Sequence, residues 1–368
     1  MNLAWRNLIQ DKTRAGLSVL GVALAIMLIL VLGGFVSGLN VQVTRYLDHA
    51  PGSIVLLRTG LQGASSVTPT NTLPDSALTA ARSTAGVAAA VPVVSQTAVL
   101  DLGSAKQFVI VVGYDPALGG GPWLMGSGRE PIADDEVVVD SVLAARRGIH
   151  LGDSLTLMGT PFRVAGSSDE STTWMTGYVF MTLAAAQKLY SAVGMLTMIF
   201  VTPAHGVAVS DLIARLDSIA DVEARPKAEL ISDTRSFYLA TMGAPLNLMA
   251  GIASLVGVTV VGLVTYTATI ERRREYGMLK AVGARNRVLY AVVAQQALVA
   301  ALAGSIVGVA AARGAAWTIM ALRPQFLITV EPSSVLTALA AGLLMALVGA
   351  LFPVRTLGRL APAEVFRG

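Results

Sequence analysis

Four long apolar runs, separated by charged segments, dominate the pattern of this 368-residue chain. Each run is free of Asp, Glu, Lys and Arg, and each exceeds the roughly 20 apolar residues that a helix needs to cross a bilayer. The pattern therefore predicts a membrane α-helical protein, with residues 313–332 as a short outer loop between the last two helices. The four predicted transmembrane helices are residues 17–43, 241–270, 288–312 and 333–354.

A long segment of mixed pattern, residues 44–240, lies between the first two predicted helices. It contains short alternating runs bounded by glycine, which are typical of strands, and Leu212, Leu216 and Ile219 fall on one helical face. The segment predicts an α+β domain inserted between helices one and two. We expect strands at 52–59, 97–102, 107–113, 136–140, 154–158 and 162–165, helices at 71–90 and 209–219, and a strand running into a helix over 179–190.

The composition indicates that lipid is the solvent for much of the chain. Hydrophobic residues make up 54% and charged residues 14%, whereas about 25% charged residues is usual for a soluble domain. A cytosolic enzyme, a disordered regulator and a nucleic-acid-binding protein are therefore disfavoured, despite the net charge of +4. Since the chain contains no cysteine, we expect the 44–240 domain to fold on its own core without disulfides.

The charges are distributed unevenly along the chain. Residues 45–236 contain 13 basic and 18 acidic side chains, whereas Lys and Arg are in excess in residues 1–16, 271–287 and 355–368. Short segments rich in Lys and Arg stay on the cytoplasmic side of a membrane. We therefore expect both termini and the 271–287 segment in the cytoplasm, and the 44–240 domain on the other side.

The N-terminal residues 1–16 combine apolar residues with Trp5, Arg6, Lys12 and Arg14 at helical spacing. This pattern predicts an amphipathic helix lying in the inner membrane interface. A basic flank with a tryptophan anchor explains the same residues, and both interpretations stay open.

The 271–287 segment carries the densest group of charges in the chain. Glu271 and Arg274 are spaced to pair on a helix, and Gly277 and Gly283 can interrupt that helix. We expect a short cytoplasmic elbow whose exposed charges and apolar side chains suit a protein contact, although three consecutive arginines would also serve topology alone. The candidate contact residues are Glu271, Arg272, Arg273, Arg274, Glu275, Tyr276, Gly277, Met278, Leu279, Lys280 and Gly283.

Glycines with small-xxx-small spacing lie within the predicted transmembrane helices. Such spacing lets two helix backbones approach closely, so these glycines are candidates for packing seams within one subunit or between two. Glycine is common in membrane helices in any case. The candidate positions are Gly34, Gly38, Gly304, Gly308 and Gly342.

No other segment points to a metal or catalytic site. His49, His150 and His205 are isolated in the sequence, so a metal site is improbable. Residues 134–136 form an acidic run that suits a solvated loop better than a cation site, and residues 60–71 suit a surface loop better than a flexible lip that contacts a partner.

ATP binding through a phosphate-binding loop is not expected for this chain. Such a loop requires a lysine directly after a glycine, and none of the lysines here follows a glycine. We expect no enzymatic activity and no cofactor in this chain.

Four stretches of the chain resemble the MacB/FtsX-like permeases, the transmembrane subunits of a class of ATP-binding-cassette systems. They are residues 4–14, the outer-domain segments 136–140, 148–153 and 162–164, the 271–288 elbow, and residues 353–367. The elbow is the most specific of them, and the outer domain resembles the MacB type more than the smaller FtsX type. Gln295 and Gln296 depart from the acidic residue of many relatives, so no intramembrane carboxylate role is carried over.

The resemblance implies four transmembrane helices per subunit and two permease subunits per complex, identical or different. It also implies that the 271–284 elbow docks as a coupling helix on an ABC ATPase, present in two copies, which binds the ATP and Mg. Residues 360–367 are expected to add to that contact. We also expect the protein to lie in the bacterial inner membrane and to work with an adaptor or delivery protein outside.

Three functions fit these observations. The first is mechanotransmission, in which ATP-driven closure of the partner moves the outer domain to export or extract a hydrophobic or amphipathic cargo such as a lipid, lipoprotein, peptide or drug. The second is an FtsX-like transmitter that regulates an outside partner such as a cell-wall hydrolase without moving cargo. The third is a membrane-anchored receptor or scaffold, which the absence of a neighbouring ATPase gene would favour.

Overall fold

The protein is described here by a computed structural model covering residues 12–60, 72–103, 106–173, 176–271, 278 and 286–358. It divides into two compact units. Residues 1–38 and 242–368 form the first, called the membrane unit, and residues 39–241 form the second, called the outer domain.

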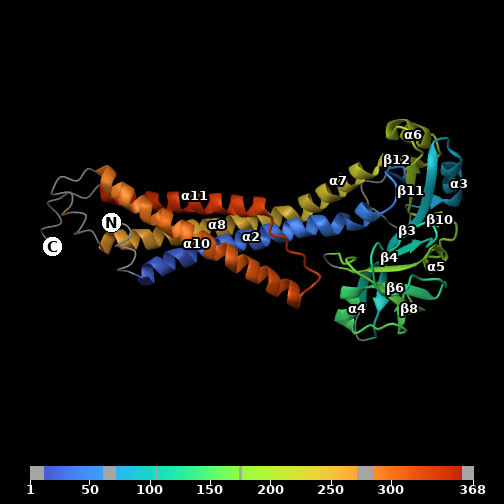
Figure 1. The fold of residues 1–368 in the computed structure, drawn as a ribbon, viewed down its shortest axis with the longest axis horizontal. Coiled ribbons are helices and arrows are strands. Elements are labelled where there is room, and N and C mark those ends of the chain that lie inside the picture. Colours follow the sequence, from blue (N-terminus) through green and yellow to red (C-terminus); the bar gives the residue numbers. More distant parts are fainter. Residues whose placement is uncertain are drawn as a thin grey trace. The chain divides into compact units, whose positions relative to one another are not determined.

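Long apolar helices build the membrane unit (Figure 1). Among the described residues, three stretches are long and apolar enough to cross a bilayer, Gly16–His49, Lys227–Val260 and Ala294–Leu322, and Pro332–Val348 is a shorter apolar helix. Membrane-type helices are thus present, while the count of four spans stays a prediction. The helices are α2 (Lys12–His49), α8 (Ala244–Glu271), α10 (Asn286–Leu322) and α11 (Pro332–Gly358).

Helices in the structure extend past the apolar runs that predict them. α2 continues to His49, and α10 continues through Arg313 to Leu322, so much of the predicted 313–332 loop is helical. A charged residue ends an apolar run but does not break a helix, and Pro324 is the first proline after Arg313. α8 likewise follows without a loop from α7 (Lys227–Tyr238) and a π-helical turn, η2 (Leu239–Gly243).

The outer domain combines a large sheet with short helices, as the α+β prediction requires. Its strands are β1 (Ile54–Arg58), β2 (Leu73–Pro74), β3 (Val87–Asp101), β4 (Lys106–Tyr114), β5 (Met125–Gly128), β6 (Glu136–Asp140), β7 (Ser154–Leu157), β8 (Thr160–Ser168), β9 (Tyr178–Thr182), β10 (Met195–Leu196), β11 (Met198–Pro203) and β12 (Val222–Pro226). Its short helices are α3 (Asp75–Ser83), α4 (Ser141–Arg147), α5 (Leu183–Leu189) and α6 (Val209–Leu216).

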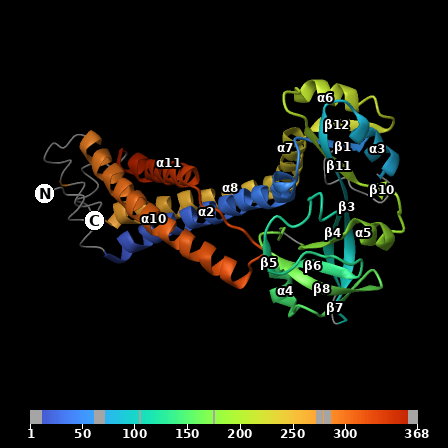
Figure 2. The same ribbon diagram turned by 45° about the vertical axis from the view of Figure 1, so that its right-hand side comes forward.

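Strand β3 divides the sheet into two lobes. The strand order is β12-β1-β11-β3-β4-β9-β6-β8-β5, with β7 against β3 and β8. β3 pairs with β11 up to Val93 and with β4 from Val94 onward. We call β1, β11, β12 and the first half of β3 the first lobe, and β4 to β9 with the second half of β3 the second lobe (Figure 2).

Both faces of the sheet are covered by apolar side chains. Ile54 and Leu56 of β1 belong to one buried cluster, and the alternate residues Val55 and Leu57 belong to another. Helices α3, α4, α5 and α6 contribute to the first cluster, and the last turn of α2 together with α7 contributes to the second. The strands are therefore buried on both sides, which requires nearly continuous apolar sequence.

One predicted element of the outer domain is wrong in part. The helix expected over 71–90 ends at Ser83, and the alanine-rich residues from Val87 onward form the start of β3. The backbone is extended at Thr84, and Gly86, with φ +99°, lies in the turn that leads into β3. Pairing with β11 then outweighs the helix propensity of alanine.

Candidate transmission site

The predicted coupling elbow lies mostly outside the described residues. Glu271 is the last residue of α8, Met278 is helical with an exposed side chain, and α10 begins at Asn286. The roles of the other elbow residues stay predictions. Those outside the described residues are Arg272, Arg273, Arg274, Glu275, Tyr276, Gly277, Leu279, Lys280 and Gly283.

The predicted interfacial helix is described only at its end. Lys12 and Arg14 lie in the first turn of α2. Trp5 and Arg6 lie outside the described residues, as do residues 360–367 of the C-terminal tail.

The paired glycines of α10 lie where this helix meets α2. A β-carbon at Gly304 would lie 2.6 Å from Val22 Cβ, and one at Gly308 would lie 2.8 Å from Ile26 Cβ. Gly342 of α11 is close to the same region, because its β-carbon would lie 3.1 Å from Ile26 Cδ1. These described contacts are all within one chain.

The paired glycines of α2, Gly34 and Gly38, contact the segment between α10 and α11 and not another helix. Thr329 donates its backbone N–H to the Gly34 carbonyl oxygen at 3.0 Å. A β-carbon at Gly38 would overlap the carbonyl oxygen of Leu327. The backbone of residues 327–329 therefore lies directly on α2, and only glycine leaves the space for it.

The end of α2 and the start of α7 lie side by side at the first lobe. β1, which follows α2, pairs antiparallel with β12, which precedes α7, in a register that places Ile54 opposite Pro226. Lys227 then donates its Nζ to the Ala50 carbonyl oxygen at 2.6 Å and its backbone N–H to the Ser53 oxygen at 2.8 Å. The end of α2 and the start of α7 are thus joined by direct hydrogen bonds.

An arginine connects the start of α7 to the sheet. Arg225 of β12 donates to Glu229 at 2.5 Å and to Asp233 at 2.6 Å, and its side chain is only 15% exposed. The hydrogen bond that Arg225 donates to Glu229 is the main cause that raises the pKa of Arg225. The first two turns of α7 are therefore hydrogen-bonded to β12, the strand that precedes this helix.

The last turn of α2 packs into an aromatic cluster. Tyr46 lies with its ring centroid 5.6 Å from Tyr178 and 6.2 Å from Phe200, and its hydroxyl donates to the Gly120 carbonyl oxygen at 2.8 Å. Tyr46 and Leu47 are buried. Sequence analysis misses this contact, because Tyr46 follows the apolar run and carries no motif.

A buried carboxylate stabilises the second lobe. Glu136 of β6 pairs with Arg129 at 2.6 Å and also with Arg163, and its side chain is 2% exposed. The Arg129 hydrogen bond lowers the pKa of Glu136 to about 2. The predicted acidic run therefore ends in an ion pair rather than in a cation site.

The described residues contain no group of three or more His, Cys, Asp or Glu side chains that could hold a metal ion. His150 lies 3.6 Å from Asp153, and the His49 Nδ1 lies 2.8 Å from the Arg45 carbonyl oxygen. The expectation that the chain holds no metal or cofactor stays a prediction.

These features define a class of membrane protein: apolar helices that continue into an α+β outer domain. Residues 15–219 match the MacB-like periplasmic core domain family, and residues 247–362 match the FtsX-like permease C-terminal family. The chain therefore belongs to the MacB/FtsX-like family of ABC transporter permeases. Membership implies a partnering ATPase subunit and a location in the inner membrane.

Similar proteins carry the same description. An uncharacterized ABC transporter permease of Mycobacterium tuberculosis strain H37Rv is 26% identical over 100% of this chain and 98% of its own length. A second such permease, from Mycobacterium bovis, is 28% identical over the same shares. The macrolide export ATP-binding/permease protein MacB of Agrobacterium fabrum is 28% identical over 43% of this chain and 24% of that protein.

Two solved structures are similar at low identity. The periplasmic region of MacB from Actinobacillus actinomycetemcomitans aligns with a TM-score of 0.40 and 14% identity, over 52% of this chain and 96% of that chain. The extracellular domain of the transporter YknZ from Gram-positive bacteria aligns with a TM-score of 0.35 and 10% identity, over 50% and 94%.

Proposed function

We propose that this permease works by mechanotransmission, in which ATP hydrolysis by a separate ATPase moves the outer domain through the long helices. The observation that carries the proposal is the junction at the first lobe. α2 and α7 both reach the sheet without a flexible linker, and Lys227 joins the two helices at Ala50 and Ser53. A displacement of either helix is therefore delivered to the sheet.

The assembly that we propose has two permease subunits, identical or different, and two ATPase subunits. Each permease contributes four transmembrane helices, with the outer domain inserted between the first two and both termini in the cytoplasm. The excess of Lys and Arg in residues 1–16, 271–287 and 355–368 supports this orientation. ATP and Mg bind to the partner ATPase, and this chain is not an enzyme. An adaptor protein outside is a further proposed component.

The proposed cargo is a hydrophobic or amphipathic molecule, such as a lipid, lipoprotein, peptide or drug, that is exported or extracted. The charge-free apolar runs offer little polar lining for a hydrophilic channel. The Agrobacterium relative is named for macrolide export, and a macrolide is amphipathic.

The alternative is an FtsX-like transmitter that regulates an outside partner, such as a cell-wall hydrolase, and moves no cargo. The match of residues 247–362 to the FtsX-like family supports this alternative. The match of residues 15–219 to the MacB-like core domain favours the first proposal. A pull-down that recovers a hydrolase, in cells without transport activity, would favour the transmitter.

The elbow provides the test of the proposal. Arg274→Glu reverses one charge in the 271–287 segment, and like-charge contacts across an interface are costly. We expect at least a roughly tenfold weaker association of the co-expressed ATPase, equivalent to about 1.4 kcal/mol, and a matching loss of ATP hydrolysis by the purified complex.

Lys188→Glu is the matched control, because Lys188 is an exposed basic residue of α5 in the outer domain. It changes the net charge equally and should leave ATPase association intact. If Arg274→Glu behaves like Lys188→Glu, the elbow does not transmit the motion.

A further inference from the structure

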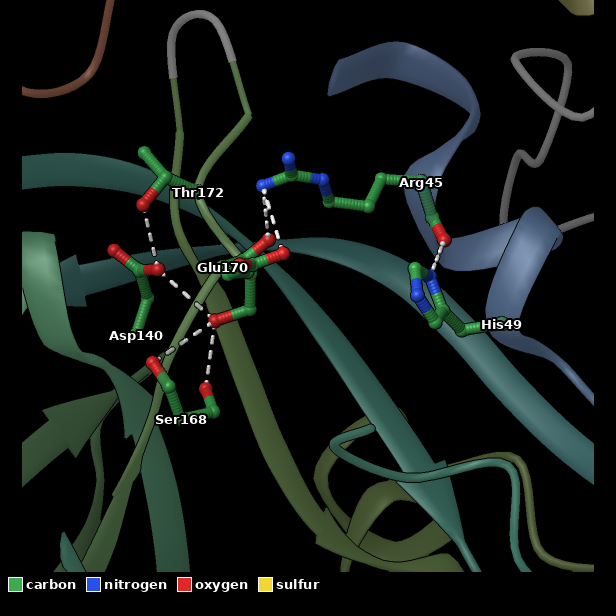
Figure 3. Close-up of polar contacts among 7 residues, drawn as sticks. Arg45, His49, Asp140, Ser168, Glu170 and Thr172 are labelled. Carbon is green, nitrogen blue, oxygen red and sulfur yellow. Dashed lines mark hydrogen bonds and ion pairs between the residues drawn. The ribbon is translucent and has the colours of Figure 1, made fainter. Parts of the chain in front are cut away.

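Helix α2 also contacts the second lobe of the outer domain, through its last turns. Arg45 donates from Nη1 to the Glu170 carbonyl oxygen at 3.0 Å, as Figure 3 shows. One turn later, the His49 ring stacks on Trp123 with centroids 4.9 Å apart. These contacts differ from the hydrogen bonds that Arg225 and Lys227 make at the start of α7, which join α7 to β12 and to the end of α2.

The segment that Arg45 holds is firmly attached to the second lobe. Ser171 and Thr172 donate their hydroxyls to Asp140 Oδ2 at 2.9 and 2.8 Å, and Ser168 lies 2.6 Å from Ser171 (Figure 3). These four side chains are buried. Asp140 ends β6 and also accepts the N–H of Leu143, so the segment is tied to both β6 and α4.

Glu170 itself has a constrained backbone. Its φ is +59°, a left-handed conformation that non-glycine residues rarely adopt. Its neighbours on both sides are fixed, since the backbone N–H of Asp169 donates to the Leu124 oxygen at 2.9 Å and Ser171 is bonded to Asp140. The Glu170 carbonyl that accepts the hydrogen bond from Arg45 is therefore held in place by its neighbouring residues in the second lobe.

The side chain of Glu170 contributes less to this contact than its backbone. Its Oε2 lies 3.7 Å from Arg45 Nη1, and the glutamate side chain is 55% exposed. Exposed ion pairs at such distances are weak. The planar guanidinium with its fixed donors suits a carbonyl at a set position.

We infer that Arg45 is the positioning residue through which movement of α2 reaches the second lobe. This inference rests on the proposed mechanotransmission. Because the end of α2 is bonded to the start of α7 at the first lobe and Arg45 is bonded to Glu170 of the second lobe, a tilt of α2 about the Lys227 junction moves Arg45 and turns the second lobe. The turn occurs about β3, where this strand changes partners between Val93 and Val94. The outer domain then opens and closes between its lobes as the helices shift.

The chain contains no cysteine, so introduced cysteines give unique spin labels. We would label Ser210→Cys on α6 in the first lobe and Ala145→Cys on α4 in the second, both exposed positions. The distance between the labels is measured by pulsed electron resonance in the full permease–ATPase complex, with and without a non-hydrolysable ATP analogue. We expect a nucleotide-dependent shift, most of which is lost in Arg45→Ala.

Three comparisons make the result specific. Glu170→Ala keeps the carbonyl and should keep the shift, and Arg45→Lys should restore part of it. A label pair within the first lobe, Ser210→Cys with Ser76→Cys, should show no shift. If Arg45→Ala lowers the melting temperature strongly, Tyr46→Phe replaces it as the test, because this change removes the hydroxyl that bonds Gly120 and keeps the ring.

The outcomes separate the two proposals. The absence of any lobe-to-lobe shift in the unsubstituted complex overturns the inferred movement between the lobes, whereas mechanotransmission itself is tested separately by Arg274→Glu. A shift that persists undiminished in Arg45→Ala, or in Tyr46→Phe where that variant replaces it, overturns the role of the α2 contact and leaves mechanotransmission standing.

Discussion

In the membrane unit the helices approach one another closely at glycines, whereas in the outer domain the strands are packed by large apolar side chains and β6 carries hydrogen-bonded carboxylates at both ends. A β-carbon at Gly308 would lie only 2.8 Å from Ile26 Cβ. By contrast, β6 presents Val137, Val138 and Val139 to the cores on both faces and ends in the buried carboxylates Glu136 and Asp140. A larger side chain at a packing glycine should therefore destabilise the membrane unit, and a smaller side chain at a buried position should destabilise the outer domain.

The solvent explains this difference. Lipid tails are as apolar as leucine, so helices in a bilayer associate through close contact rather than through exclusion of water. In the outer domain, burial of apolar surface away from water provides the driving force, and each buried polar group must be hydrogen-bonded.

Gly38→Leu is expected to have the largest effect. A side chain at this position would overlap the Leu327 carbonyl oxygen, a backbone atom that cannot rotate away. We expect a loss of stability above about 3 kcal/mol, beyond the usual range for overpacking. The measurement is thermal unfolding of the full chain in detergent, together with the yield of monodisperse protein.

Gly33→Leu is the matched control for this change. Gly33 lies in the same helix, and a β-carbon there meets nothing within 4 Å. Equal damage from both substitutions would show that α2 tolerates no leucine for other reasons, and the contrast between the two units would lose its support.

The sequence predicts the existence of the long helices but not their ends. Charge-free runs indicate where lipid is the solvent, yet α2 reaches His49 and α10 reaches Leu322, because a charged residue does not end a helix and the next prolines are Pro51 and Pro324. Small-xxx-small spacing predicts that Gly304 and Gly308 lie at a helix–helix contact, but it does not identify the other helix. The structure supplies that partner, α2.

The outer domain is predictable where local signals agree. The strand expected at 136–140 is β6 to the residue, and Asp140 before α4 is a recognisable helix cap. Strand β11 was not predicted from its own sequence. The pairing of Arg45 with Glu170 joins residues 125 positions apart, and no spacing rule connects them.

Asp140→Ala tests how much the buried hydrogen bonds of the outer domain contribute to stability. It removes the acceptor for the hydroxyls of Ser171 and Thr172 and for the Leu143 N–H. Since these donors are left buried and unsatisfied, we expect a loss of about 2 kcal/mol. Thermal unfolding of the full chain measures it.

Asp140→Asn is the control, because the amide oxygen can still accept from the Leu143 N–H while the amide NH2 donates to the two hydroxyls, which can also accept. Burial raises the pKa of Asp140, and the hydrogen bonds from Leu143, Thr172 and Ser171 only partly offset this, so its negative charge does not favour folding. The asparagine variant should therefore retain most of the stability. A loss as large as that of Asp140→Ala would mean that the charge, and not the acceptor, holds the segment.

Glu136, at the other end of β6, should respond to pH in the opposite sense. The Arg129 pair lowers its pKa from 4.5 in the unfolded chain to about 2 in the folded one. The folded state therefore gains stability from the ionised form above pH 4.5 and loses it as the pH falls from 4.5 toward 2. We expect only about 1 kcal/mol, because Arg129 and Arg163 are about half exposed and water screens the pair.

Unfolding of the full chain in a non-ionic detergent between pH 5 and pH 2 tests this expectation, with Glu136→Gln as the comparison. The glutamine variant cannot ionise at this position, so its stability should fall less steeply with acid than that of the unsubstituted chain. Asp140→Asn should show the reverse, because protonation of Asp140 relieves the penalty of burying a charge. Parallel acid profiles for all three proteins would mean that neither end of β6 is linked to folding by its charge.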